Sequence, residues 1–324
     1  MTYRFRNFIL AATITLPCLA GTAASAEETV LRAVSAFQLG TVFYKPFERF
    51  VEQVNENGKG LVRFEVIGGP DAMPPFEVGN ALRGGIIDLA NTTAVYHANL
   101  VPEGLAMTLT DLSMKDLRAN GGYDLLDQIH RDKAKIHWLG RLTENIKYHI
   151  YLSNAPDEVD FDGLKIRSAP TYQAFFSAIG ITPVQTAPGE VFTALERGTI
   201  DGYAWPSIGV FDLGWQEKTG ARIEPGFYQV ETGAYFSEAS WNKLTEEQKT
   251  FLTDQMIAFE AGADSNIAFA DEELARQAEF GIKTYTLEGE ARDSFTSQAI
   301  DQGWKPVIEA SPDLGPKLRE LLVK

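Results

Sequence analysis

The sequence predicts an α/β protein of two lobes, each a mixed, mostly parallel sheet flanked by helices. Three features carry this expectation: alternating strand and helix patterns near the N-terminus, one ten-residue segment that occurs twice, and a long helical stretch after the second copy. Strands that alternate with helices along a chain usually pair in parallel within one sheet. A repeated unit then implies two lobes of related construction.

The first strand and helix signals lie in residues 29–69. Residues 29–37 and 61–69 alternate apolar and polar side chains, as half-buried strands do. Between them, residues 41–60 have the spacing of an amphipathic helix that ends in Asn57-Gly58. Strand, helix and strand in this order begin a parallel sheet.

The repeat is formed by "ALRGGIIDLA", residues 81–90, and "ALERGTIDGY", residues 194–203. Both copies have Ala-Leu, a glycine at the fifth position, and Ile-Asp at the seventh and eighth. Each is typical of a last helical turn, a glycine in the left-handed conformation that ends it, and a short buried strand. A chance match is the alternative to two related lobes.

The second lobe begins after a β-rich run at residues 138–154. Residues 164–167 form a short strand, residues 171–179 a helix, and the second repeat copy follows. Thr245 and Gln248 then form a capping-box pattern. They predict one long helix over about residues 246–280, roughly 50 Å at 1.5 Å per residue, lying across both lobes.

We therefore expect lobe I in residues 27–150 with 234–324, which includes the spanning and C-terminal helices, and lobe II in residues 151–233. Residues 1–26 have the pattern of a cleaved secretory signal peptide: two arginines, an apolar stretch, and Ala-Ser-Ala at the end. The only cysteine, Cys18, would leave with it. The expected location is the periplasm, for a monomer without disulfides.

Charge and missing motifs exclude several functions. The net charge of −15 falls to −17 without Arg4 and Arg6, and such a surface repels nucleic acid and anionic lipid. No zinc-protease, nucleophile-elbow, dinucleotide or phosphate-loop motif occurs. The four histidines have no metal-type spacing, so we expect no metal and no cofactor: His97, His130, His137 and His149.

Arg167 is the residue with the clearest binding chemistry. It ends the predicted strand 164–167, and ligands of open α/β sheets bind at the carboxyl ends of strands. The amides at the start of the following helix also favour an anion. A guanidinium fork is well matched to a carboxylate. The alternative is a solvated surface arginine.

Residues 162–206, "DGLKIRSAPTYQAFFSAIGITPVQTAPGEVFTALERGTIDGYAWP", resemble the central segment of the solute-binding proteins of TRAP transporters, the DctP family. "ALRGGIIDLA" and "SWNKLTEEQK" match the family as well. The resemblance implies a two-lobed periplasmic-binding-protein-like fold that closes on an organic acid. It also implies no enzymatic activity, a salt bridge from Arg167 to the ligand carboxylate, and delivery to a TRAP permease driven by an ion gradient.

Two departures from the family pattern bear on the ligand. His149 stands where many relatives have a second arginine, and residues 201–206, Asp-Gly-Tyr-Ala-Trp-Pro, replace a more polar sequence. One anion clamp and an apolar Trp205 favour an aromatic monocarboxylate over a dicarboxylate or a sugar acid. The candidate binding residues are Arg167, His149, Trp205, Phe192, Tyr96, Tyr235, Thr92 and Phe37.

Two other functions stay open on the sequence alone. A secreted hydrolase or lyase on the same scaffold would use His149 and nearby carboxylates, and turnover of the ligand would identify it. A ligand-sensing subunit of a signalling kinase would share the binding chemistry of a transport receptor and differ only in its partner.

Overall fold

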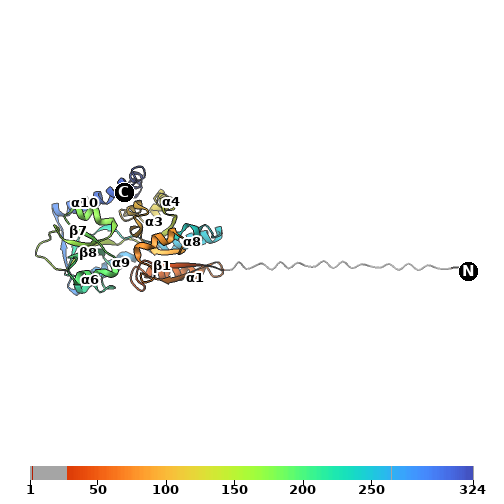
Figure 1. Ribbon diagram of the computed structural model, residues 1–324, viewed down its shortest axis with the longest axis horizontal. Helices are drawn as coiled ribbons and strands as arrows, with labels where there is room; N and C mark the ends of the chain where they lie inside the picture. Colours follow the sequence, from red (N-terminus) through yellow and green to blue (C-terminus); the bar gives the residue numbers. More distant parts are fainter. Residues whose placement is uncertain (1, 3–27, 264, 324) are drawn as a thin grey trace.

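The computed structural model describes residues 2, 28–263 and 265–323 (Figure 1). The predicted signal peptide and Cys18 fall outside these residues, apart from Thr2. None of the helices within the described ranges combines the length and apolar character needed to cross a bilayer.

Lobe I is built on a five-stranded sheet. Its strand order is β2 (Val62–Gly68), β1 (Thr29–Ser35), β3 (Leu89–Thr92), β11 (Thr232–Ser237) and β4 (Ile136–Thr143). The first three strands are parallel, and β11 runs antiparallel to both of its neighbours. Helices around this sheet are α1 (Lys45–Asn57), α2 (Val78–Arg83), α3 (Met114–Asn120), α4 (Gly122–Ala134), α7 (Glu238–Trp241), α8 (Glu246–Glu260) and α11 (Gly315–Leu322), with 3₁₀ turns at Pro75–Glu77, Ala94–His97 and Pro102–Thr108.

Lobe II is built on a seven-stranded sheet. Its path is β12 (Lys283–Thr286), β9 (Ala221–Glu224), β5 (Lys147–Leu152), β8 (Gly202–Pro206), β6 (Lys165–Ser168) and β7 (Thr182–Gln185), and β10 (Phe227–Gln229) pairs with β5. Strands β7, β6 and β8 are parallel, and β5 is antiparallel to β8. Its helices are α5 (Gln173–Ala178) and α6 (Val191–Glu196), with 3₁₀ turns at Pro170–Tyr172, Pro188–Glu190 and Trp215–Lys218. The predicted fold of two lobes with mixed sheets flanked by helices is confirmed. The sheets are less parallel than expected, because half of the strand pairings of each lobe are antiparallel.

The two copies of the repeat occupy equivalent places. The order β2–β1–β3 in lobe I corresponds to β7–β6–β8 in lobe II. Gly85 and Gly198 have left-handed φ angles of 67° and 65°, and the amide after each donates to a carbonyl five residues earlier, which ends α2 and α6 in the same way. Each repeat aspartate, Asp88 and Asp201, accepts a backbone N–H of the neighbouring parallel strand at 2.8 Å.

The chain crosses between the lobes twice in short segments, from β4 to β5 at residues 144–146 and from β10 to β11 at residues 230–231. Helix α10 (Gly289–Ala310) packs on α5 of lobe II and on the 3₁₀ turn 102–108 of lobe I. Two strands that the expected boundaries assign to lobe I, β5 with its start at Lys147 and β12, belong to the sheet of lobe II.

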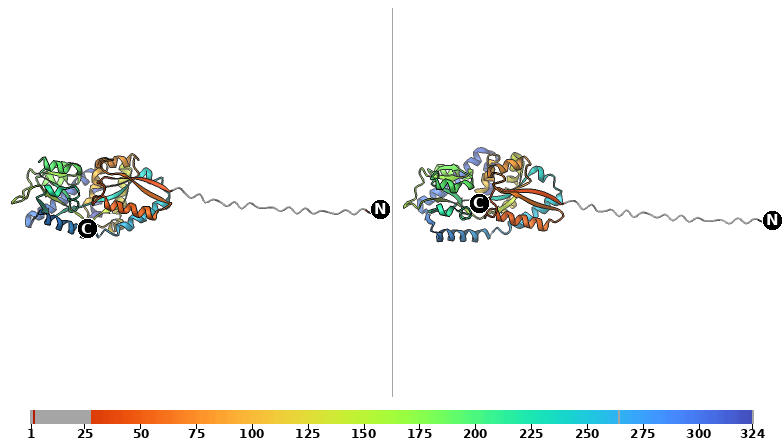
Figure 2. Two further views of the ribbon diagram at one scale, coloured as in Figure 1. Left: turned by 90° about the horizontal axis from the view of Figure 1, so that it is seen from below. Right: turned by 60° about the horizontal axis from the view of Figure 1, so that its bottom comes forward.

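The single long helix expected over residues 246–280 is wrong, because α8 ends at Glu260 and α9 (Ser265–Phe280) begins after a break. Gly262 lies in that break, and glycine is a poor helix former because its backbone loses the most entropy on folding. The two helices still reach both lobes, as Figures 1 and 2 show: α8 packs on α1 and β4, and Gln277 of α9 donates to the Ser207 carbonyl of lobe II.

The left-handed glycine that ends α6 yields a stability test. In Gly198→Ala the new Cβ meets no atom within 4 Å, so the effect is conformational, and we expect a loss of about 1 kcal/mol in the free energy of unfolding. Gly189→Ala, at an equally open position without a left-handed φ, is the control and should be near neutral. Urea unfolding of both variants measures the difference; equal values for the two would contradict this reading of the repeat.

Candidate functional site

The carboxyl ends of the parallel strands of both lobes face one cavity. Its walls come from residues that end or follow β1, β3, β6 and β8, as expected for ligand sites of open α/β sheets. The lining residues are Phe37, Phe43, Thr93, Val95, Tyr96, Tyr148, Arg167, Ala169, Tyr172, Trp205, Pro206, Val230, Glu231 and Thr232. Both lobes and the crossing segment 230–231 therefore contribute to this cleft cavity.

Arg167 is the only basic residue of the lining, and it is 1% exposed. Its Nε donates to the Thr186 carbonyl at 2.9 Å, and Nη1 donates to the Tyr172 hydroxyl at 3.2 Å and to the Ala204 carbonyl at 3.3 Å. Nη2 has no hydrogen-bond partner within the described chain, and no acidic side chain there forms a salt bridge with the guanidinium. The solvated surface arginine that the sequence left open is thus excluded.

Aromatic rings surround this guanidinium. The Arg167 Cζ lies 5.3 Å from the centroid of the Trp205 ring, and Trp205 meets Phe43 edge to face with centroids 5.7 Å apart. Burial raises the pKa of Tyr172 to about 12, although the charge of Arg167 opposes this rise. Burial likewise raises the pKa of Tyr96. Both phenols therefore stay neutral and can donate hydrogen bonds at physiological pH.

Glu231 is the only acidic residue of the cavity lining, and it is fully buried. Its Oε2 accepts from the Ala94 amide at 3.0 Å and the Thr93 hydroxyl at 3.1 Å, and its Oε1 accepts from the Tyr235 hydroxyl at 2.8 Å. Burial raises the pKa of this carboxyl, while these donors and the charge of Arg141 oppose the rise. The cavity thus carries one cationic and one acidic group.

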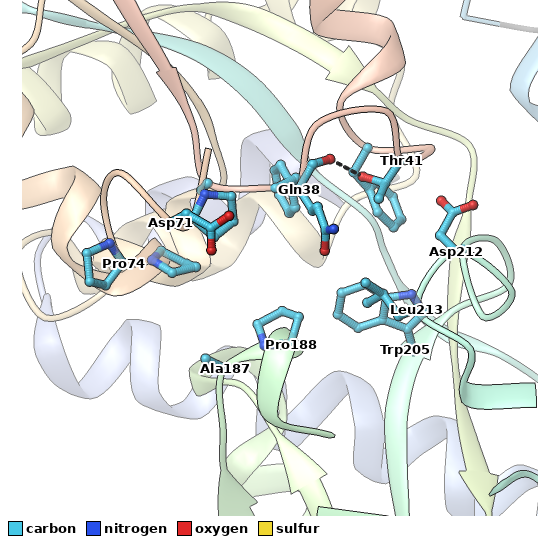
Figure 3. Close-up of a pocket in the computed structure, with 16 residues that line it drawn as sticks. Gln38, Thr41, Asp71, Pro74, Ala187, Pro188, Trp205, Asp212 and Leu213 are labelled. Atoms are coloured by element: carbon cyan, nitrogen blue, oxygen red, sulfur yellow. Dashed lines mark hydrogen bonds between the residues drawn. The ribbon is translucent and has the colours of Figure 1, made fainter. Parts of the chain in front are cut away.

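The cleft cavity holds about 20 Å³, roughly the space of one water molecule. A second cavity of about 250 Å³ lies beside it and shares Phe37, Phe43 and Trp205 as a common wall. Figure 3 shows this outer cavity between Gln38, Asp71 and Pro74 on one side and Pro188 and Trp205 on the other. Its lining residues also lie after strand ends in both lobes. Movement of the shared wall would join the two spaces.

Four of the eight candidate residues from the sequence meet at the cleft cavity: Arg167, Trp205, Tyr96 and Phe37. The other four, His149, Phe192, Tyr235 and Thr92, are not in its lining. Phe192 lies on α6, where its ring lies 5.4 Å from Lys218 Nζ. Tyr235 reaches the cavity only through its hydrogen bond to Glu231.

His149 and Thr92 point away from the cleft. His149 Nδ1 lies 3.2 Å from the Ile223 carbonyl and 3.5 Å from Glu224 Oε1, on the side of β5 opposite Tyr148. Burial lowers its pKa, so the imidazole is neutral. Thr92 is buried in β3, and the next residue, Thr93, lines the cavity instead.

Sequence reasoning missed Glu231, Tyr148 and Tyr172 of this lining. The signal for Glu231 was a single carboxylate within an otherwise uncharged run, residues 225–237. Tyr148 and Tyr172 carried no comparable signal, because aromatic residues in a chain this rich in them are mostly core. Within the described ranges, no three histidine, cysteine, aspartate or glutamate side chains gather as a metal site would require.

Comparison with known proteins gives one family match and several relatives. The model of the bacterial extracellular solute-binding proteins, family 7 (DctP), matches residues 133–309, more than half of the chain. A monocarboxylate 2-oxoacid-binding periplasmic protein of Nostoc sp. is 23% identical over 249 residues, which cover 73% of this chain and 68% of that protein.

A solute-binding protein of Roseobacter denitrificans is 23% identical over 247 residues, which cover 74% of this chain and 76% of that protein. Its crystal structure, with bound L-galactonate, matches at a TM-score of 0.78 and 18% identity over 91% of this chain and 99% of that one. A TRAP periplasmic solute-binding protein of Desulfovibrio salexigens with bound orotic acid matches at a TM-score of 0.81 and 16% identity, over 90% and 97% of the two chains. The structural matches reflect a shared fold.

A buried histidine pair beside the site predicts acid sensitivity. Burial lowers the pKa of His97 well below its usual value, the charge of His130 lowers it further, and the two rings lie 5.5 Å apart. The unfolded chain takes up a proton as the pH falls through about 6.5, and the folded chain does not. The free energy of unfolding therefore decreases as the pH falls below 6.5, by about 1.4 kcal/mol per pH unit for each proton.

The variant His97→Gln should show a shallower loss between pH 7.5 and 5.5, whatever its stability at pH 7.5. Urea unfolding at three pH values gives the slope for each protein. Titration of Glu231, which acts in the opposite direction, is common to both proteins and cancels in the comparison. Identical slopes for wild type and variant would show that His97 does not carry the effect.

Proposed function

Because this chain belongs to family 7 of the bacterial extracellular solute-binding proteins, the receptors of TRAP transporters, we propose that it binds a monocarboxylate with a flat, largely apolar body. It is a receptor and not an enzyme. The proposal includes the class of ligand acid, the residues that bind it and the division of the chain into lobes. It also includes export through a cleaved signal peptide, a monomeric state and delivery of the ligand to the membrane subunits of a TRAP permease.

The observation that carries the proposal is the state of Arg167. A guanidinium at 1% exposure has three hydrogen bonds to neutral groups and an Nη2 without a partner in the described chain. A buried charge is costly unless an opposite charge compensates it. A ligand carboxylate supplies that charge and a hydrogen-bond acceptor for the free nitrogen.

The lining favours one carboxylate over two. Arg167 is the only cation of the cavity, so a second carboxylate of the ligand would have no positive partner there and would face Glu231. His149 lies outside the lining and does not contribute to this preference. When Glu231 is ionised, like charges in this site of low dielectric constant repel strongly, which disfavours dicarboxylates more than the lack of a second arginine does.

The apolar body of the ligand is inferred from the six aromatic residues of the lining: Phe37, Phe43, Tyr96, Tyr148, Tyr172 and Trp205. Apolar surface buried against such walls contributes roughly 25 cal/mol per Å², and aromatic pairs add to this. The present volume of about 20 Å³ is too small for such a body. Binding therefore requires that the lobes move relative to each other, or that the shared wall moves toward the outer cavity.

The ligand class can be tested with a panel of acids in thermal-shift and calorimetric measurements. We expect benzoate-type or other flat monocarboxylates to raise the melting temperature more than succinate-like dicarboxylates or sugar acids do. Sugar acids and dicarboxylates are the two alternative ligand classes within this family. Stabilisation by uronates or C4 dicarboxylates, with no effect of benzoates, would overturn the proposed class and leave the receptor function intact.

Replacement of Arg167 tests the clamp. Arg167→Lys should lose at least tenfold in affinity for the best acid of the panel, because one ammonium cannot reproduce the fork and the charge-assisted bonds are worth roughly 1.5–3 kcal/mol. The matched control is Arg222→Lys, a buried arginine of β9 that lies outside the cavity. Calorimetry on both variants separates loss of ligand binding from loss of a buried arginine. An affinity of Arg167→Lys within threefold of wild type would refute the clamp.

A further inference from the structure

We propose that Glu231 accepts a hydrogen bond from the ligand body, so that the receptor selects carboxylates that also carry a hydroxyl or N–H group. This inference rests on the proposed function and specifies its substrate class. Three features of Glu231 support it: its position, the occupancy of its two oxygens, and the absence of a basic partner among the described residues.

Glu231 lies at the point where the chain crosses from lobe II to lobe I. It follows β10 of one sheet and precedes β11 of the other. Its side chain is held on the lobe I side by Thr93, Ala94 and Tyr235. Glu231 therefore lines the cavity from a segment other than the strand that carries Arg167.

The carboxylate has an acceptor position to spare. A carboxylate offers about four lone-pair sites, and Glu231 uses two on Oε2 and one on Oε1. The Ala94 amide can only donate a hydrogen bond. The Thr93 hydroxyl accepts from the Val95 amide, so it donates its proton to Glu231. The remaining site on Oε1 can therefore accept a donor from a ligand in the cavity.

No basic side chain of the described ranges forms a salt bridge with Glu231. Arg141, whose charge opposes the rise in the pKa of Glu231, is itself bound to Glu144 at 3.2 Å and to carbonyl oxygens. A fully buried carboxylate gains more from each added donor than an exposed one does, because water cannot replace that donor. A ligand hydroxyl or N–H group would be recognised strongly there.

Arg167 and Glu231, on separate segments of the lining, would also bind different ends of the ligand. The acid group would bind Arg167 of lobe II, and the donor would bind Glu231, which is tied to lobe I. A ligand with both groups gains its full contacts only when the lobes are together, which supplies differential energy for closure. An acid without the donor would lack the second contact.

The test is calorimetry on matched acids at pH 7.5. Each set compares an acid with a donor, the same acid without it, and, for the aromatic set, the methyl ether, which keeps size and acceptor but removes the donor. The sets are benzoate with its hydroxy and methoxy isomers, cyclopentanecarboxylate with pyroglutamate, and propionate with lactate. We expect at least one donor-bearing acid to bind at least tenfold more tightly than its partners.

In Glu231→Gln this preference should fall to within threefold, while the affinity for the donor-free acid changes less than threefold. Glu103→Gln, another fully buried glutamate but outside the cavity, is the matched control and should keep the preference. If Glu231→Gln does not fold, Glu231→Asp, whose shorter side chain withdraws the charge from the ligand, should lower the preference instead.

The outcomes separate the two proposals. Binding of monocarboxylates without any donor preference in the wild type, or a preference that survives in the Glu231 variant, overturns the role of Glu231 and leaves the proposed function standing. Failure of every acid in the sets to bind overturns both.

Discussion

A buried guanidinium that has no acidic partner among the described residues is the constraint on which the cleft depends. Arg167 ends β6, between β7 and β8, and carbonyl oxygens of Thr186 and Ala204 fix its fork in place. Those oxygens supply dipoles and no countercharge, so an anion is stabilised there more than in water. In the proposed function this local charge binds the ligand, in a protein whose net charge of −15 would repel an anion at a distance.

The repeated strand-and-helix unit places that guanidinium opposite a second wall. In each lobe the repeat aspartate, Asp88 or Asp201, bonds the backbone of the neighbouring parallel strand, and the left-handed glycine turns the chain into the buried strand. Both units therefore direct their strand ends toward the same space. Since each lobe lines part of the cavity, ligand contacts depend on how the lobes lie together, which is the physical basis of closure in two-lobed receptors.

The chemistry of the cavity is asymmetric. We propose that Arg167 attracts a carboxylate and that Glu231, when ionised, repels a second one; aromatic rings occupy much of the remaining surface. Attraction at one point and repulsion at another give specificity that neither gives alone. The shared wall of Phe37, Phe43 and Trp205 separates the cleft cavity from the larger outer one. In the proposed function, the position of this wall would limit the length of the ligand body.

The sequence alone determined the α/β character of both lobes, the glycines that end α2 and α6, and the place of Arg167 at a strand end, because these depend on local pattern and backbone conformation. Tertiary structure decided which face of each strand meets the cleft. Tyr148 lines the cavity and its neighbour His149 faces Glu224, and the register of β5 against β8 sets this alternation. The place of Glu231 was likewise beyond local pattern, because it depends on where the chain passes from one sheet to the other.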